Sequence, residues 1–223
     1  MPRRTNTRER LITTAAELFW RQGYAQTGVN EIMQQARTTS GSFYHFFPTK
    51  DDLLLAVVDH VAEILETEVF GPAEELTSDP FERIIAVMEA SRRHLAAHDF
   101  TLGSPLGSLA AEVSESHPAV RRRIAGLFEQ WTERVRAYFG EAGDRLPAGV
   151  DRDGLARFAL SIVEGAILQA RVERNFAAFD ASIFELQEHF RLLQLTGDLG
   201  RVRETRPRPA TPSSAGTTDW RAW

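Results

Sequence analysis

The chain has 223 residues, of which 43% are hydrophobic and 26% are charged, a balance that suits a globular protein with a substantial core. It has no cysteine, which excludes disulfides, thiolate metal sites and thiol-based redox sensing. The net charge of −5 hides an asymmetry, because residues 1–50 carry seven basic and three acidic side chains (net +4) and the remaining residues carry −9. A basic head on an acidic body suits phosphate binding at one end, although chance clustering on a solvated surface would give the same numbers.

No apolar run approaches the roughly 18 residues that a membrane span requires. The basic residues 1–10 lead into an amphipathic helix rather than the short apolar core of a signal peptide. We therefore expect a cytoplasmic protein with no membrane partner, associated with the nucleoid if it binds DNA.

Apolar residues recur at helical spacing along most of the chain, and strand patterns are absent. The predicted helices cover residues 7–22, 27–36, 39–47, 49–71, 80–95, 106–115, 118–138, 151–175 and 180–195. Residues 1–6 are predicted to form a flexible basic arm. Proline, serine and threonine dominate residues 197–223, which we expect to be a disordered tail, although Trp220 and Trp223 could belong to a docking peptide.

The stretch from Thr27 to Lys50 differs from the other helices. Its second helix carries small polar and aromatic side chains where a buried helix would carry an apolar stripe: Thr39, Ser40, Gly41, Ser42, Phe43, Tyr44 and His45. Such side chains are short or flexible enough to follow base edges in the major groove of DNA, whereas Phe43 and Phe46 are expected to be core residues.

Polar residues are predicted to begin the helices in and after this stretch. Thr27 is the expected cap of the helix over residues 27–36, and Thr39 or Ser40 is the expected cap of the next one. The turn between them is placed at Arg37-Thr38, and Thr49 is predicted to cap the long helix that follows.

The stretch resembles the DNA-binding domain of the tetracycline-repressor (TetR) family of bacterial regulators. The family pattern, roughly T-x-V-x-x-I-A-x-A-A-G-V-S-K-G-S-x-Y-x-Y-F-x-x-K, aligns with it without a gap. The matching residues are Thr27, Val29, Ile32, Ala36, Gly41, Ser42, Tyr44, Phe47 and Lys50. The resemblance covers about residues 7–55 and implies an all-α fold, with a three-helix helix-turn-helix DNA-binding domain over residues 7–48 and a helical ligand-binding and dimerisation domain over residues 49–196.

The resemblance implies that double-stranded operator DNA is a partner. Tyr44 is expected to touch the DNA backbone or a thymine methyl group, His45 to lie near a phosphate and Lys50 to pair with one. The expected DNA-binding residues are Arg3, Arg4, Arg8, Thr27, Asn30, Thr38, Thr39, Ser40, Gly41, Ser42, Tyr44, His45 and Lys50. A core position for Tyr44, and solvated side chains for the arginines, are the competing interpretations.

Three departures from the family pattern lie in the turn and at the start of the recognition helix. Arg37 stands where the family usually has glycine, so it must adopt an uncommon backbone conformation or the turn must differ. Thr38-Thr39 replaces Val-Ser, and Ser40 replaces a common lysine, which removes one phosphate contact. We expect the docking to survive and the sequence preference to change.

One head makes too few contacts for tight specific binding, so a homodimer that reads a palindrome is expected. The last two predicted helices would supply half of a four-helix bundle. The expected interface residues are Leu155, Ala159, Ile162, Ala166, Gln169, Ile183, Leu186, Phe190 and Leu193. The alternative is that these faces pack within one chain.

The acidic body is expected to bind an unidentified small-molecule inducer, with no cofactor and no metal. The expected lining is Met88, Ser91, Leu106, Leu109, Phe128, Trp131 and Glu164. Glu164, amid apolar neighbours, is the polar group most in need of a partner, which a ligand or an arginine could provide. Ligand binding would change the spacing of two heads through the helix that begins at Lys50, and repression is the commoner outcome in the family.

The segment Gly103-Ser104-Pro105-Leu106-Gly107 also resembles a subgroup of the family that often reads G-C-x-x-G. Some members of that subgroup sense electrophiles or oxidants through the cysteine. Ser104 stands at that position here, so this thiol mechanism does not carry over.

Two other classes of function stay open at this point. His94 and His98, four residues apart on one helix face, are a possible metal pair for an enzyme, although a solvated helix end explains them as well. A helical adaptor that uses the tryptophan tail would show no salt-dependent DNA affinity.

Overall fold

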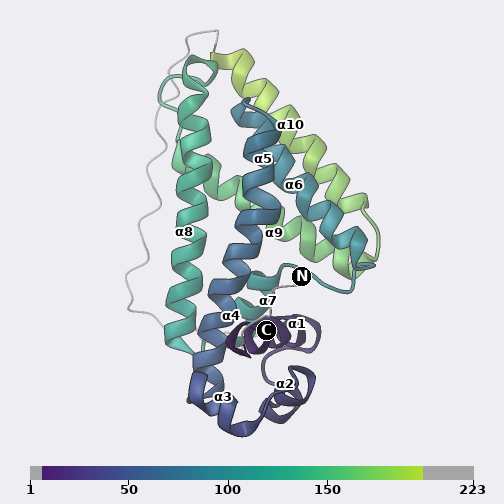
Figure 1. Cartoon of the computed structure of the whole chain (residues 1–223). Helices are drawn as coiled ribbons and strands as arrows, with labels where there is room; N and C mark the ends of the chain where they lie inside the picture. The colour runs from purple at the N-terminus through teal and green to yellow at the C-terminus, as the bar shows by residue number, and fades with distance from the viewer. Residues whose placement is uncertain (1–6, 198–223) are drawn as a thin grey trace, which may run out of the picture.

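The computed structural model describes residues 7–197, and every regular element in this range is helical (Figure 1). The predicted all-α class is therefore confirmed. Helices α1 (Thr7–Gln22), α2 (Val29–Gln35) and α3 (Ser40–Phe46) form a head at the bottom of Figure 1. The longer helices of the body stand above it.

The helices α3 and α4 (Lys50–Leu65) begin at two of the predicted caps. The Thr39 hydroxyl oxygen accepts a hydrogen bond from the Ser42 backbone N–H at 3.2 Å. Thr49 and Asp52 satisfy each other's backbone N–H groups in a capping box. Because α4 is fixed at its first turn, the position of the head depends on the direction of this helix.

The predicted cap at Thr27 is wrong. The N-cap position of α2 is occupied by Gly28, which makes no side-chain hydrogen bond. The Thr27 side chain is only 1% exposed, and its hydroxyl donates to the Gly23 carbonyl oxygen at 2.7 Å. Thr27 therefore closes the loop after α1 from inside.

The long helix α4 continues through a π-helical segment, η1 (Glu66–Phe70), into α5 (Gly71–Leu76). The prediction ended this helix near residue 71. The Gly71 N–H donates to the Glu66 carbonyl oxygen, the i to i−5 bond of a π-helix. Pro72 follows and has no N–H to donate, which is why the regular bonding pattern changes here.

Five further helices complete the body. They are α6 (Pro80–Ala97), α7 (Pro105–Val113), α8 (Pro118–Glu141), α9 (Arg152–Glu173) and α10 (Ala177–Gly197), with a short 3-10 turn η2 (Gly143–Arg145). Proline stands in the first turn of α6, α7 and α8, where its missing N–H costs nothing. In Figure 1, α8 and α10 form two long edges of the body.

Two main clusters of buried side chains hold these helices together. One joins α1, α2, α3 and α4 of the lower half with α7 and the first half of α8. The other joins α6, the second half of α8, α9 and α10. The head therefore has no core of its own, because apolar residues of α7 and α8 complete it.

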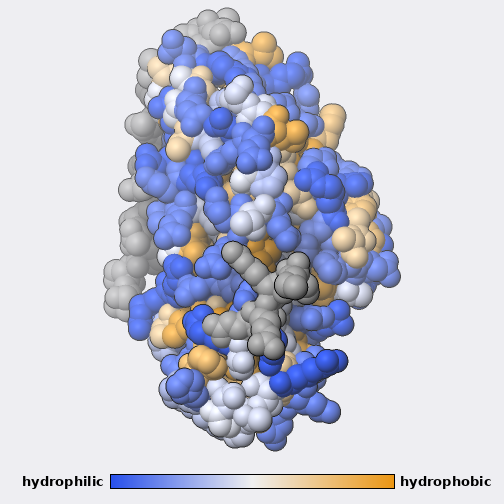
Figure 2. Space-filling view, in the orientation of Figure 1, coloured by the Kyte–Doolittle hydropathy of each residue, from blue (hydrophilic) through white to orange (hydrophobic). Residues whose placement is uncertain are grey.

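The face of the molecule in Figure 2 is mostly hydrophilic, with apolar patches between polar side chains. Within residues 7–197, no helix is long and apolar enough to cross a membrane.

Candidate DNA-binding face and ligand cavity

Helix α3 has one side in the core and one in solvent. Phe43 is fully buried, and Phe47 just after the helix is 3% exposed. The opposite side carries Ser40, Gly41, Tyr44 and His45, all exposed, and we call these four residues the outer face of α3. Tyr44 is 53% exposed, so its alternative interpretation as a core aromatic is wrong.

The turn between α2 and α3 has the conformation that glycine usually adopts. Arg37 has φ of +48°, in the left-handed region where a Cβ atom is strained. Its carbonyl oxygen accepts a hydrogen bond from the Arg10 guanidinium at 3.2 Å. The chain thus keeps the turn despite the non-glycine residue, with support from α1.

A junction of five residues joins the head to the body: Tyr24, Lys50, Asp51, Glu112 and His117. The Glu112 carboxylate on α7 accepts the backbone N–H groups of Tyr24, at 2.8 Å, and of Ala25, at 2.7 Å. The Lys50 ammonium donates to the Tyr24 carbonyl oxygen at 2.5 Å and lies 3.8 Å from the centre of the Tyr24 ring. Burial lowers the pKa of Lys50, against the effects of the Glu112 and Asp51 charges.

The other side of the junction adds two contacts around the same ring. The Tyr24 hydroxyl donates to the Asp51 carboxylate, and burial followed by this bond raises the pKa of the phenol. The His117 Nε2 atom is 3.4 Å from the Asp51 carboxylate, and its ring meets the Tyr24 ring edge-on at 4.9 Å between centroids. The loop after α1 is therefore held by α4, α7 and the start of α8 together.

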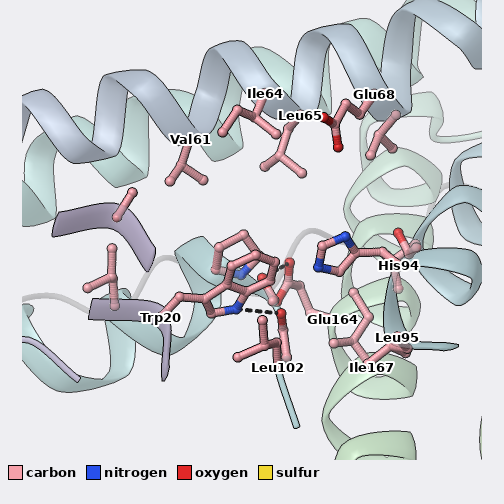
Figure 3. Close-up of a pocket in the computed structure, with 18 of the residues that line it drawn as sticks. Trp20, Val61, Ile64, Leu65, Glu68, His94, Leu95, Leu102, Glu164 and Ile167 are labelled. Atoms are coloured by element: carbon pink, nitrogen blue, oxygen red, sulfur yellow. Dashed lines mark hydrogen bonds between the residues drawn. The ribbon is translucent and has the colours of Figure 1, made fainter. Parts of the chain in front are cut away.

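A cavity of about 380 Å³ lies between the head and the body. Its walls come from α1, α4, η1, α6, the loop before α7, α7, α8 and α9. Apolar and aromatic side chains make most of the lining, among them Trp20, Phe70, Leu109, Phe128 and Trp131. Figure 3 shows Trp20 reaching into the cavity from α1. This is the size and character of a small-molecule site.

Two ionisable side chains, Glu164 and His94, lie partly buried among the apolar residues of the cavity wall. Glu164 on α9 accepts a hydrogen bond from the Ser104 hydroxyl at 3.0 Å, and burial raises the pKa of its carboxyl group. His94 on α6 stacks on Trp20, with 4.6 Å between ring centroids. Burial, together with the neighbouring His98, lowers the pKa of His94 to about 4, so the imidazole is neutral at pH 7.

Comparison with known proteins decides which kind of molecule this is. Residues 11–57 match the family model described as bacterial regulatory proteins of the tetR family, and residues 80–183 match the LmrA/YxaF-like transcriptional regulator C-terminal domain. The transcriptional regulator AcuR of Cereibacter sphaeroides is 31% identical over 169 residues, which are 73% of this chain and 75% of AcuR. The chain belongs to the TetR family. It is a DNA-binding transcriptional regulator.

Other TetR-family proteins agree over most of the chain. The regulator YxaF of Bacillus subtilis is 30% identical over 78% of this chain and 90% of its own length. The repressor DhaR of Mycobacterium sp. strain GP1 is 26% identical over 79% and 88%. The crystal structure of a TetR regulatory protein from Rhodobacter sphaeroides superposes with a TM-score of 0.73 at 27% identity, over 82% of this chain and 98% of that one.

Within this TetR-family fold, most residues expected to contact DNA lie on or beside α3. Asn30 and Thr39 are exposed like the outer face of α3, and Thr38 and Ser42 are half-buried. The two arm arginines expected to contact DNA, Arg3 and Arg4, lie outside the described residues. Arg8 is exposed and its guanidinium lies over the Phe47 ring at 5.5 Å.

Two expected DNA contacts need correction. Thr27 is buried and its hydroxyl is bonded to Gly23, so it presents nothing to DNA. The Lys50 ammonium is held by the Tyr24 carbonyl and ring, which makes it a residue of the junction rather than a free phosphate contact. The sequence pattern could not show the position of the Lys50 ammonium, because Tyr24 lies 26 residues before it in the chain.

The cavity contains five of the seven residues expected to line it, namely Ser91, Leu109, Phe128, Trp131 and Glu164. Met88 and Leu106 are not among its lining residues. Both side chains have a relative exposure of 0%, because Leu106 is packed in the first apolar core and Met88 in the second. The prediction missed Trp20, Ser104 and His94, because they belong to α1, to a loop and to a pair interpreted as a metal site or a solvated helix end.

The interface residues predicted on α9 and α10 are mostly wrong. Their apolar positions pack inside the chain; those buried are Ala159, Ala166, Ile183, Leu186, Phe190 and Leu193. Leu155 and Ile162 are partly buried against the same core, and Gln169 is exposed. The alternative, packing within one chain, holds for this face. A different apolar face stays exposed, formed by Phe158, Leu168, Val172, Phe184, Leu192 and Leu195, and we call it the α9–α10 apolar face.

The histidine pair expected as a possible metal site has another environment. His94 and His98 have ring centroids 4.5 Å apart, and both lie against Trp20. Over residues 7–197, no group of three or more His, Cys, Asp or Glu side chains is arranged to hold a metal ion. The interpretation as a solvated helix end is wrong for His94, whose ring is part of the cavity wall.

Proposed function

We propose that this TetR-family protein is a homodimeric repressor that binds a palindromic operator through α3 and is released when a small molecule enters the cavity. The observation that carries the proposal is the course of α4. Its first turn is capped beside α3, and its later turns, with η1, line the cavity through Val57, Val61, Ile64 and Leu65. A ligand that displaces this helix would therefore move the head.

The outer face of α3 supports the proposed docking. Ser40, Tyr44 and His45 are exposed and make up one side of a helix that Phe43 anchors in the core. Side chains of this kind donate and accept hydrogen bonds at base edges and phosphates. Arg8, at the start of α1, brings a positive charge to the same end of the molecule.

Gly41 offers a test that does not disturb the fold. A Cβ atom added at Gly41 would meet no atom within 4 Å, so Gly41→Ala fits the free protein. If the outer face of α3 lies against DNA, the added methyl group would separate the surfaces, and operator affinity should fall by about ten-fold or more, which corresponds to about 1.4 kcal/mol. Fluorescence anisotropy with DNA from the flanking intergenic region, at two salt concentrations, measures this.

The matched control is Gly140→Ala in α8, where an added Cβ atom also meets nothing within 4 Å. This variant should bind the DNA as the wild type does. Equal affinity of the Gly41 variant would contradict the placement of α3, and an affinity independent of salt would favour the adaptor alternative.

The proposed dimer uses the α9–α10 apolar face. A row of large apolar side chains at helical spacing on two adjacent helices is costly to leave in water and suits a four-helix bundle with a second copy. Val172, which is 74% exposed, provides the test, and Leu76 on α5, also 74% exposed, is the control. Val172→Glu should halve the mass measured by light scattering, while Leu76→Glu should not. A monomeric wild type would refute the dimer.

A further inference from the structure

We infer that the cavity binds a protonated amine carried on a flat apolar body. This inference rests on the proposed ligand-binding role of the cavity and names the chemistry of the ligand. Three observations on the described residues carry it: an acidic group that has no cationic partner among them, an imidazole nitrogen that has no hydrogen-bond partner among them, and a wall of aromatic rings.

The first observation is the charge of the lining. Among the described residues around the cavity, Arg21 is the sole lysine or arginine, and it is paired with Glu17 at 3.0 Å. Within residues 7–197, the Ser104 hydroxyl is the only group that donates a hydrogen bond to Glu164, and Glu68 lies on the opposite side of the cavity in Figure 3. A buried carboxylate is costly without a cation, so a cation that enters the cavity would be held there.

The second observation is the buried Nε2 atom of His94, which has no hydrogen-bond partner in the part of the chain that the structure describes. Because burial keeps this imidazole neutral, one of its ring nitrogens can accept a hydrogen bond. Figure 3 shows His94 and Glu164 directed into the same space. A primary ammonium group has three N–H donors, enough to satisfy both groups at once, whereas a quaternary ammonium has none.

The third observation is the shape and chemistry of the remaining wall. Trp20 lies at one side, and Phe128 and Trp131 meet edge-on at 5.5 Å between centroids. Phe70 continues the cluster, at 5.6 Å from the Trp131 ring. Aromatic faces attract both a flat apolar body and a positive charge. A carboxylate ligand would instead meet the charge of Glu164.

The experiment compares four probes that share a naphthalene ring, bound to the full-length protein and followed by naphthalene fluorescence. They are 2-(1-naphthyl)ethylamine, its isostere 1-propylnaphthalene, its N-trimethyl derivative and 1-naphthylacetate. We expect the amine to bind at least about ten-fold more tightly than the other three. Equal or tighter binding of the hydrocarbon or the acetate overturns the inference.

Two variants locate the effect. Glu164→Gln is isosteric and removes a costly buried charge, so the variant should fold. It should weaken binding of the amine about ten-fold and leave the affinity for the hydrocarbon unchanged. His94→Phe keeps a ring against Trp20, and it should weaken binding of the amine but not binding of the trimethyl derivative. The control, Glu129→Gln, changes a carboxylate paired with Arg157 and should alter nothing. Equal losses for amine and hydrocarbon in Glu164→Gln would overturn the inference.

Operator release, measured by anisotropy, separates this inference from the proposed function. Release by the acetate but not by the amine would overturn the inference and leave the proposed function intact. Binding of the amine without any release would support the inference and count against the proposed release mechanism.

Discussion

Glu112 provides the sharpest test of how the head is attached to the body. Its carboxylate accepts two backbone N–H groups, those of Tyr24 and Ala25, at 2.8 and 2.7 Å. Glu112→Ala leaves both donors without this acceptor. A hydrogen bond to a charged group contributes about 1.5–3 kcal/mol, but water can replace much of it at an exposed site, so we expect a combined loss of about 2 kcal/mol.

Amide hydrogen exchange reports this loss locally. If the loop after α1 opens with about 2 kcal/mol less free energy, the Tyr24 and Ala25 amides should exchange about 30-fold faster. The control is Glu115→Ala, three residues further along the chain, whose exposed side chain makes no hydrogen bond or ion pair within residues 7–197 and whose removal should leave both amides protected. Unchanged exchange in Glu112→Ala would refute the reasoning, because the carboxylate would then hold nothing.

Three further outcomes are expected. Ser40→Lys should strengthen operator binding and steepen the slope of log affinity against log salt concentration by about one unit. An unchanged slope in a salt titration would place Ser40 away from phosphate. Arg37→Gly should raise the free energy of unfolding in urea by about 0.5–1 kcal/mol, because it relieves the φ of +48°; a loss would show that the arginine side chain stabilises the turn. Because the pKa of His94 falls from 6.5 to about 4 on folding, the unfolded chain binds the extra proton between these values, so stability should rise with pH from about 4 to 6.5. His94→Phe should flatten that rise in urea titrations, and an unchanged pH profile would contradict the buried neutral imidazole.

The fold could be predicted from the sequence where the information is local. Apolar spacing placed α1 at its observed bounds, and Thr49, as a cap residue, marked the start of α4. The π-helical segment was missed, because nothing in the periodicity distinguishes residues 66–70 from regular helix, although Pro72 is its physical cause.

The candidate sites, too, could be predicted where they depend on local sequence and not where they depend on residues distant in the chain. The outer face of α3 followed from an unbroken local pattern, whereas the role of Lys50 depends on Tyr24 and Glu112, which are distant in sequence. On α9, apolar residues occur on more than one side, so the stripe in the core and the exposed stripe could not be distinguished. Only the packed positions of α6, α8 and α10 show which stripe is covered.

Trp20 has a consequence for engineering. It belongs to the first helix of the DNA-binding head, yet it lines the ligand cavity, and its indole N–H donates to the Gly103 carbonyl oxygen at 3.0 Å. A chimera that exchanges the whole head with that of a relative would therefore also exchange part of the ligand site. A graft limited to residues 28–47 would change the operator specificity and keep the native cavity wall.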